Sequence, residues 1–200
     1  MSEPDAKRPV ILALAGSNGA GKSTFYRSFL ANSGLRFLNA DNLARELNID
    51  AYKAADLVNV YRQKLVDDAE SFIFETVLSD TVGDKINFLR QAAKTGYDVT
   101  LVFIGLDSPE SSIQRVGMRV AQGGHDVPEE KLQDRFERTL ANLALALASL
   151  PKVVVFDNSD LRTPYEKLAA YHDGRAIFAA ETLPKWFQRV LRKNKKLKPR

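Results

Sequence analysis

The chain has 200 residues, 44% of them hydrophobic, and its 29 lysines and arginines outnumber 25 aspartates and glutamates to give a net charge of +4. This composition is typical of a globular chain and excludes disorder for its bulk. Because cysteine is absent, disulfides, cysteine-ligated metal sites and a thiol nucleophile are excluded. No apolar run approaches the roughly 20 residues of a membrane span, and the N-terminus lacks a signal-peptide pattern, so we expect a cytoplasmic protein with no membrane contact.

Short apolar runs rich in β-branched or aromatic residues alternate with longer segments in which apolar residues recur every three or four positions. The runs predict buried strands and the longer segments predict helices. This alternation predicts an α/β fold with a five-stranded, mostly parallel sheet covered by helices on both faces. In such sheets ligands bind beyond the carboxyl ends of the strands. The expected strands are Val10–Ala15, Phe37–Ala40, Ser71–Phe74, Asp98–Leu106 and Lys152–Phe156.

Capping patterns mark several expected helix starts. Asp107-Ser108-Pro109 places a proline near a helix start, and Asp126-x-x-Glu129 and Thr163-Pro164-x-Glu166 are capping boxes. The helix expected after the second of these patterns carries apolar residues at helical spacing. They are Leu132, Phe136, Leu140, Leu143 and Leu147.

The first expected strand runs directly into a G-x-x-x-x-G-K-[ST] motif, which a helix over 23–30 follows. Gly16 and Gly21 allow backbone torsions that direct N–H groups toward phosphate oxygens. Lys22 reaches the β- and γ-phosphates, and the Ser23 hydroxyl ligates Mg²⁺. The motif therefore predicts a P-loop that binds a nucleoside triphosphate. The expected nucleotide-binding residues of the loop are Gly16, Ser17, Asn18, Gly19, Ala20, Gly21, Lys22, Ser23 and Thr24.

One carboxylate stands at the carboxyl end of each of the next two strands: Asp41 in Asn39-Ala40-Asp41, and Glu75 in the run that ends Glu75-Thr76. Such groups can accept the proton of an attacking hydroxyl or hold substrate, so Asp41, Glu75 and Thr76 are expected at the acceptor site. Asp41 could instead cap a helix, and Glu75 could form a purely structural ion pair. A P-loop ATPase or GTPase would usually close this strand with aspartate, so Glu75 favours a kinase.

Two helical segments between the fourth and fifth strands carry arginines on either side of Gly123-Gly124, which predicts a helical lid over about residues 108–138. Arg115 and Arg119 share one helix face, while Arg135, Arg138 and Asn142 form a stripe away from the apolar one. Guanidinium groups that close over phosphates stabilise the charge of phosphoryl transfer. Exposed arginines paired with nearby acids are the alternative. We interpret His125 as a hydrogen-bonding loop residue and His172 as a surface residue.

The motifs GSNGAGKSTF, NADNLA, FIFETVLS, RVAQGGHDVPEEKLQDRFERTLANL and VVVFDNS, in that order over about residues 10–160, resemble the zeta-toxin family of P-loop kinases. The resemblance implies a nucleotide-kinase-like fold with a lid, and ATP- and Mg²⁺-dependent phosphorylation of a hydroxyl on a small-molecule acceptor. Characterised members phosphorylate UDP-N-acetylglucosamine. Only residues 42–70 separate the second and third strands, so we expect the acceptor site to differ from that of larger members, and nothing in the sequence indicates an antitoxin partner.

The resemblance also implies roles for single residues. Asp41 matches the general base, Glu75 the acidic residue of the substrate site, and Arg119 a lid arginine that engages the triphosphate. Either Arg135 or Arg138 matches the second lid arginine. We therefore expect Lys22, Asp41, Arg119 and Arg135 to be catalytic, and Arg115 and Arg138 to contact the nucleotide.

The last segment, 184–200, holds eight lysines and arginines and no acid, so the remaining residues carry a net charge of −4. We expect a single kinase domain over 1–183 and a basic tail over 184–200, in which Trp186, Phe187, Val190 and Leu191 recur at helical spacing and dock on the body. The tail leaves a nucleic-acid-associated P-loop protein as an alternative, although the body has no basic stripe and nucleic acid is not the expected partner. A regulatory protein that binds ATP without transferring phosphate is another alternative.

Overall fold

The structure, a computed structural model, describes residues 8–121 and 127–193. These residues form one sheet in the order β2-β3-β1-β4-β5-β6-β7. Strands β1 to β5 are parallel, whereas β6 and β7 are antiparallel additions at one edge. The α/β class is confirmed, but the expected number of strands was wrong, because the sheet has seven and not five. The strands are β1 (Val10–Ala15), β2 (Arg36–Leu38), β3 (Phe72–Thr76), β4 (Asp98–Gly105), β5 (Lys152–Asp157), β6 (Glu166–His172) and β7 (Arg175–Ala179).

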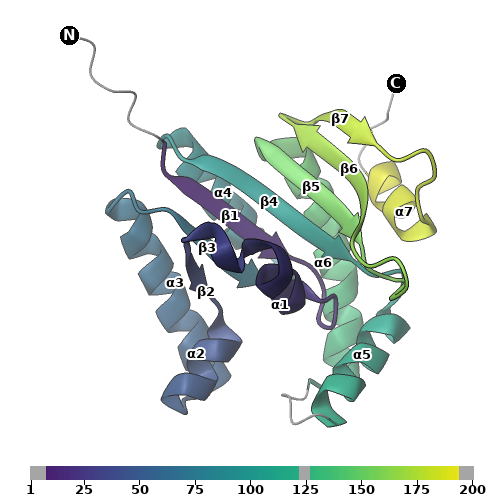
Figure 1. The fold of residues 1–200 in the computed structure, drawn as a ribbon, viewed down its shortest axis with the longest axis horizontal. Coiled ribbons are helices and arrows are strands. Elements are labelled where there is room, and N and C mark those ends of the chain that lie inside the picture. The colour runs from purple at the N-terminus through teal and green to yellow at the C-terminus, as the bar shows by residue number, and fades with distance from the viewer. Residues whose placement is uncertain (1–7, 122–126, 194–200) are drawn as a thin grey trace.

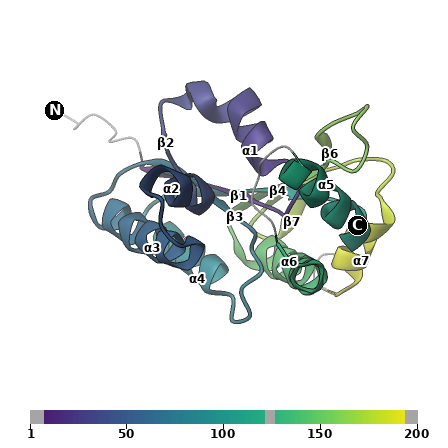
Figure 2. The same cartoon turned by 90° about the horizontal axis from the view of Figure 1, so that it is seen from below.

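Helices cover both faces of the sheet. Helix α1 lies on one face, and α3, α4 and α6 lie on the other (Figure 2). The carboxyl ends of the parallel strands lie along one edge, where α2, α5 and the start of α1 are found (Figure 1). No helix in the described ranges is long and apolar enough to cross a membrane. The helices are α1 (Lys22–Phe25), extended by a π-helical turn (Tyr26–Leu30) and a 3-10 turn (Ala31–Ser33), α2 (Ala40–Leu47), α3 (Ala51–Asp67), α4 (Asp84–Lys94), α5 (Pro109–Ala121), α6 (Glu129–Ser149) and α7 (Lys185–Lys193).

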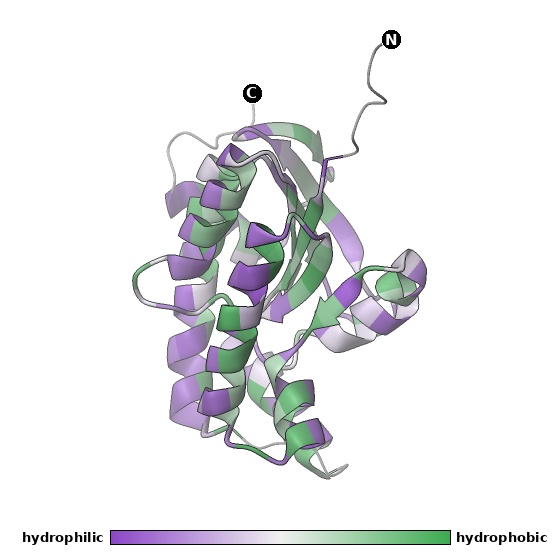
Figure 3. Cartoon of the chain, turned by 90° about the vertical axis from the view of Figure 1, so that its left-hand side faces the viewer, coloured by the Kyte–Doolittle hydropathy of each residue, from purple (hydrophilic) through white to green (hydrophobic). Residues whose placement is uncertain are grey.

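The core lies between the sheet and its helices. The central strands are predominantly hydrophobic, whereas the helices carry both kinds of residue (Figure 3). On α6 the five apolar residues at helical spacing, from Leu132 to Leu147, are all buried, as predicted. Burying one such side chain contributes about 1.5–3 kcal/mol to stability, so α6 is strongly anchored. This anchoring makes α6 a rigid support for the polar residues that it presents at the edge of the sheet.

The β6–β7 hairpin occupies a region for which the sequence predicted a helix. Thr163-Pro164-x-Glu166 does not start a helix, because β6 begins at Glu166. Asp173 and Gly174 make the turn, with φ of 48° and 75°. Two successive residues with positive φ form the tight turn that matches the twist of antiparallel strands. Of the other capping patterns, Pro109 is the first residue of α5, as expected, and Asp126 lies outside the described residues.

Helix α7 packs onto the body through Trp186, Phe187, Val190 and Leu191, which are buried as their spacing predicted. The Trp186 ring covers Gly105 at the end of β4, where an added Cβ would lie 2.3 Å from the ring. The indole N–H of Trp186 donates to Asp157 Oδ1 at the end of β5 (3.3 Å). The C-terminal helix is therefore attached to the strand ends that flank the P-loop.

Candidate active site

The P-loop follows β1 and crosses the ends of the neighbouring strands. Gly16 has φ 147°, and a Cβ there would lie 2.2 Å from Ile104 O. Gly21 precedes α1 with φ 92°, and a Cβ there would lie 2.6 Å from Asn158 Nδ2. Both positions exclude larger residues, because an added Cβ would clash with atoms of the neighbouring strand or loop. The loop is thus held against the sheet edge by close packing.

Three side chains outside the loop donate hydrogen bonds to its carbonyl oxygens. In a trans peptide the C=O of one residue points away from the N–H of the next. Holding these carbonyls outward therefore turns the N–H groups of residues 19, 21 and 22 toward the concave side, as phosphate binding requires. The sequence reasoning missed all three side chains, although Asn158 directly follows β5 at the binding edge. The Ser112 hydroxyl donates to Asn18 O (2.7 Å), the Asn158 amide to Ala20 O (2.8 Å) and the Tyr165 hydroxyl to Gly21 O (3.0 Å).

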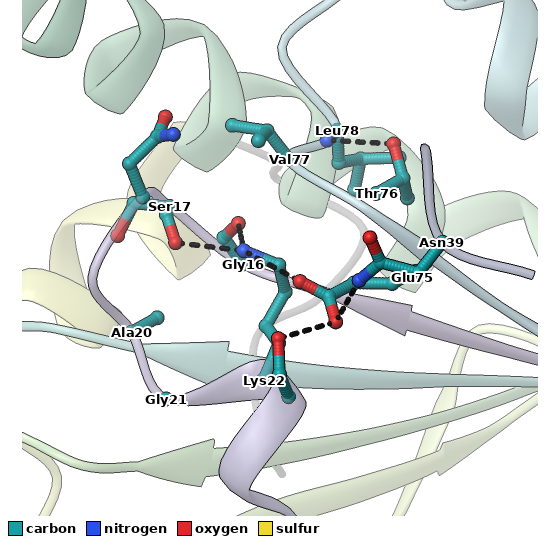
Figure 4. A network of polar contacts seen from close by, with 12 residues as sticks. Gly16, Ser17, Ala20, Gly21, Lys22, Asn39, Glu75, Thr76, Val77 and Leu78 are labelled. Atoms are coloured by element: carbon teal, nitrogen blue, oxygen red, sulfur yellow. Dashed lines mark hydrogen bonds and ion pairs between the residues drawn. The ribbon is translucent and has the colours of Figure 1, made fainter. Parts of the chain in front are cut away.

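Glu75, near the end of β3, joins two P-loop residues to β2 (Figure 4). Its Oε2 accepts hydrogen bonds from Ser23 Oγ (2.9 Å) and Asn39 Nδ2 (2.8 Å). Its Oε1 lies 3.8 Å from Lys22 Nζ, and both side chains are nearly buried, with 12% and 6% exposed. The ammonium of Lys22 also donates to Gly16 O (2.9 Å) and to a second loop carbonyl. Glu75 therefore forms an ion pair with the lysine of the P-loop.

Burial lowers the pKa of the Lys22 ammonium below its ordinary value of 10.5. The negative charges of Glu75 and Asp41 oppose this shift, and the positive charge of Arg119 adds to it. All three groups act on Lys22 through space, so Asp41 and Arg119 share its electrostatic environment. The structure thus brings the expected base and one expected lid arginine toward the P-loop lysine.

Asp41 does not cap α2. The cap is Asn39, whose Oδ1 accepts from Asn42 N (3.0 Å), and Asp41 lies exposed in the first turn of the helix. The alternative interpretation of Asp41 as an N-cap is therefore wrong. Asn39 is a second residue that the sequence reasoning missed, since it both caps α2 and fixes Glu75. Thr76 accepts a hydrogen bond from Leu78 N (3.1 Å) and shapes the turn after β3.

Three of the expected lid arginines differ in their surroundings. Arg115 donates to Ser159 O (3.0 Å) in the loop after β5. Arg138 donates through Nε to Ser79 O (3.0 Å), and its Nη1 lies 3.9 Å from Asp134. Half-buried Arg135 has no hydrogen bond or ion pair within residues 8–121 and 127–193. Of the two candidates for the second lid arginine, Arg135 is thus the one that makes no such contact with the body.

The stripe of Arg135, Arg138 and Asn142 does not face solvent along its whole length. Asn142, its last residue, is buried and donates to Leu78 O (2.8 Å) and Asp80 O (2.9 Å). The sequence gives no signal of this contact, because the spacing shows which residues share a face and not what covers it. The expected Gly123-Gly124 hinge and His125 lie outside the described residues. His172 ends β6 and is exposed.

A cavity of about 380 Å³ opens beside Asn39, between β2, α2 and α3. Its walls are mainly apolar and aromatic, and Asn42 and Glu46 add polar groups. Ligand pockets commonly combine such walls with a few polar groups. Because Asn39 also bonds Glu75, this cavity adjoins the carboxylate network. The apolar walls are made by Phe37, Leu43, Leu47, Leu57, Val58 and Tyr61, among others.

Comparison with known proteins identifies relatives of the whole arrangement. Residues 50–167 match the zeta toxin family. An uncharacterized protein of Haemophilus influenzae is 28% identical over 127 residues, which cover 60% of this chain and 88% of that protein. The solved complex of AvrRxo1-ORF1 and -ORF2 with ATP matches with a TM-score of 0.71 and 17% identity. That match covers 93% of this chain, which spans only 64% of the AvrRxo1-ORF1 length.

The expectation about an antitoxin partner needs correction. The toxin–antitoxin system PezAT of Streptococcus pneumoniae matches with a TM-score of 0.57 and 19% identity, over 82% of this chain and 73% of that one. Because PezAT is a toxin–antitoxin system and the AvrRxo1 structure is a two-protein complex, the expectation that no antitoxin partner is indicated is overturned. The family match itself covers more than half of the 200 residues. The chain therefore belongs to the zeta toxin family of P-loop kinases.

Proposed function

We propose that this protein uses ATP and Mg²⁺ to phosphorylate a hydroxyl of a small-molecule acceptor, with UDP-N-acetylglucosamine as the leading candidate. The observation that carries the proposal is the convergence of Lys22, Ser23 and Asn39 on Glu75 at the carboxyl edge of the sheet. A phosphate-binding loop and an acceptor-side carboxylate thereby share one network. A kinase needs this proximity, because the attacking hydroxyl must lie in line with the γ-phosphate.

The residues fit ATP and Mg²⁺. The buried Ser17 Oγ and Asn18 Oδ1 have no hydrogen-bond partner within the described residues, so the loop retains polar groups for a ligand. Ser23 and Glu75 would hold Mg²⁺, which commonly takes one or two protein ligands and completes its shell with phosphate oxygens and water. When bound, Mg²⁺ neutralises charge on the β- and γ-phosphate oxygens.

In the proposed reaction, the acceptor oxygen bonds to the γ-phosphorus while the bond from that phosphorus to the bridging oxygen of ATP breaks, and ADP leaves. Asp41 accepts the hydroxyl proton. Lys22, Arg119 and Arg135 stabilise the charge that spreads over the phosphate oxygens, and closure of the arginines excludes water. Glu75 orients Ser23 and Asn39.

The cavity beside Asn39 supports a sugar nucleotide as acceptor. Its volume of about 380 Å³ and its aromatic walls suit a planar base, which stacks on aromatic rings. A base in this cavity would leave the rest of the acceptor near Asn39, on the side of Glu75 and Asp41. This inference concerns the acceptor alone, and the roles proposed for the phosphoryl-transfer residues do not depend on it.

The test is ADP release from the purified chain with ATP, Mg²⁺ and a panel of UDP-sugars, nucleosides and free sugars. We expect release that depends on UDP-N-acetylglucosamine and is absent with free N-acetylglucosamine. Activity only with another acceptor would refute the choice of acceptor and retain the kinase. ATP binding without turnover on any acceptor would favour the regulatory alternative.

We also propose that the chain pairs with a protein partner of the antitoxin type, which the PezAT system and the AvrRxo1 complex support. Co-expression with the product of the neighbouring gene, followed by size-exclusion chromatography with light scattering, tests this. A stable heteromeric complex is expected. Elution of the chain as a separate 22.3 kDa species would contradict it.

A further inference from the structure

Helix α6 holds the segment that follows β3 by hydrogen bonds. We call this segment, Val77–Asp80, the β3 turn. Three side chains of α6 donate hydrogen bonds to all four of its carbonyl oxygens. They are Thr139 Oγ1 to Val77 O (2.9 Å), Asn142 Nδ2 to Leu78 O (2.8 Å) and Asp80 O (2.9 Å), and Arg138 Nε to Ser79 O (3.0 Å).

The β3 turn has a backbone conformation that needs support. Leu78 is 1% exposed and has φ 59°, a left-handed conformation that is uncommon for a branched residue. Such a conformation persists only where the surroundings of the residue hold it. Thr139 and Asn142 are buried and supply that hold. Apolar side chains could fill the same space without desolvating polar groups, so the donors serve the conformation of the turn and not merely the packing of the helix.

The hydrogen bonds between α6 and the β3 turn connect two parts of the proposed active site. The β3 turn directly follows Glu75 and Thr76, the expected acceptor-side residues. On α6, Arg135 precedes Arg138 and Thr139 by three and four residues, so these residues lie on adjacent turns of one helix face. The acceptor side of the site and a proposed lid arginine are therefore attached to the same rigid helix.

From this arrangement we infer that Thr139 and Asn142 are positioning residues, which fix the position of the acceptor-side β3 turn relative to Arg135. This inference rests on the proposed kinase function. Neither residue touches the reacting atoms. Their effect is on where the acceptor lies relative to the arginine, and any displacement of α6 carries the β3 turn with it. A displacement of about 1 Å in an active site can lower turnover about a hundredfold.

The experiment uses three variants of α6 and one control in the full chain. Thr139→Val keeps the shape of the side chain and removes the hydroxyl, and Thr139→Ser restores the hydroxyl. Asn142→Leu removes both amide donors. Ser149→Ala is the matched control, because the Ser149 hydroxyl bonds only within α6, to Leu145 O (2.7 Å). The measurements are the KM for UDP-N-acetylglucosamine, the KM for ATP, kcat, and amide hydrogen exchange of the β3 turn with and without ATP.

We expect Asn142→Leu to raise the acceptor KM or lower kcat roughly tenfold, and Thr139→Val roughly threefold, with the KM for ATP within about twofold of the wild type. Amides of the β3 turn should exchange faster in both variants. In the wild type, ATP bound by Arg135 should slow this exchange by holding α6 in place against the β3 turn, and both variants should lose that protection. Thr139→Ser should recover most of the wild-type behaviour, and Ser149→Ala should resemble the wild type.

Equal changes in both KM values, together with a general loss of thermal stability, would show a merely structural role and overturn the inference. Unchanged exchange of the β3 turn would also overturn it. If Asn142→Leu does not fold, the Thr139→Val and Thr139→Ser pair decides. Absence of acceptor-dependent ADP release in the wild type would refute the proposed function, and the exchange measurements with ATP would then still decide whether α6 controls the β3 turn.

Discussion

At the scale of residues, the two carboxylates of the site have different environments. Both oxygens of Glu75 face donors or a cation, namely Ser23, Asn39 and Lys22. The Asp41 carboxylate is exposed and has no hydrogen-bond donor among the described residues. The donors around Glu75 fix the position of its carboxylate, whereas the exposed carboxylate of Asp41 is open to the hydroxyl of an acceptor. This contrast favours Asp41 as the base and Glu75 as the organiser of the site.

Asp41→Ala should therefore lower kcat by about 10²- to 10⁴-fold and change the affinity for ATP little, because it removes a group needed only in the chemical step. Steady-state kinetics and ATP titration check this. The matched control is Asp56→Ala, which removes an exposed carboxylate from α3 and should leave both quantities unchanged. Loss of ATP binding in Asp41→Ala would mean that Asp41 serves the nucleotide instead.

The lowered pKa of Lys22 predicts an unusual pH dependence of ATP binding. The ammonium binds phosphate only when protonated, and its pKa in the free protein is lowered mainly by burial. ATP affinity should accordingly fall as pH rises through this lowered pKa, at a lower pH than an ordinary lysine would allow. Isothermal titration from pH 7 to 10 tests this. Lys22→Arg should remove the decline, since arginine remains charged, and a decline that persists would assign it to another group.

At the scale of elements, the P-loop depends on partners from α5 and from the segment after β5. Tyr165→Phe removes the hydroxyl that holds Gly21 O. The peptide between Gly21 and Lys22 is then less constrained, and we expect the KM for ATP to rise roughly threefold to tenfold with little effect on the acceptor KM. Tyr171→Phe is the control, because this buried tyrosine makes no hydrogen bond through its hydroxyl within the described residues. Equal effects of both substitutions would contradict the proposed role.

The sequence predicted the parallel core and the P-loop because both follow from local signals, namely apolar runs and a motif with a mechanism. It did not predict β6 and β7. The sequence around Leu168, Ala169 and Ala170 lacks the β-branched residues that marked the other strands, and every residue of β7 is exposed. The usable signal was Asp173-Gly174, a dipeptide that favours a two-residue hairpin. The Thr163 capping pattern competed with this signal and misled the prediction.

The candidate site was predictable only in part. Strand ends identified Asp41 and Glu75, because a residue at the carboxyl end of a parallel strand must lie near the P-loop. Ser112, Tyr165 and Asn142 could not be found in this way. Each acts by bonding a backbone carbonyl of a distant segment, and the backbone groups of a segment leave no trace in its side-chain pattern. Such contacts depend on tertiary packing and become visible only in the folded chain.

At the scale of the whole molecule, the basic C-terminal segment divides into two parts with different expected roles. Residues 185–193 form α7, whose Trp186 is 3% exposed and whose Phe187 is fully buried. Glu137 of α6 lies 3.0 Å from Arg189 and 3.9 Å from Lys193, so some of the positive charge is paired on the body. We therefore propose that the folded domain continues beyond residue 183 and includes α7, and that the sequence expectation of a tail applies after residue 193.

Two truncations test this division. Removing residues 194–200 should leave the melting temperature and ADP release unchanged. Removing 184–200 should expose the surface that Trp186, Phe187 and Val190 cover and prevent cooperative folding, since truncating one large buried aromatic residue alone costs about 3–5 kcal/mol. Trp186→Ala gives a smaller loss of the same kind, which urea unfolding measures. Arg192→Ala on the exposed face of α7 is the control. If the shorter chain instead folds and keeps its activity, the domain ends at residue 183. Nucleic-acid binding that falls steeply with salt and vanishes on removal of 194–200 would revive the nucleic-acid alternative.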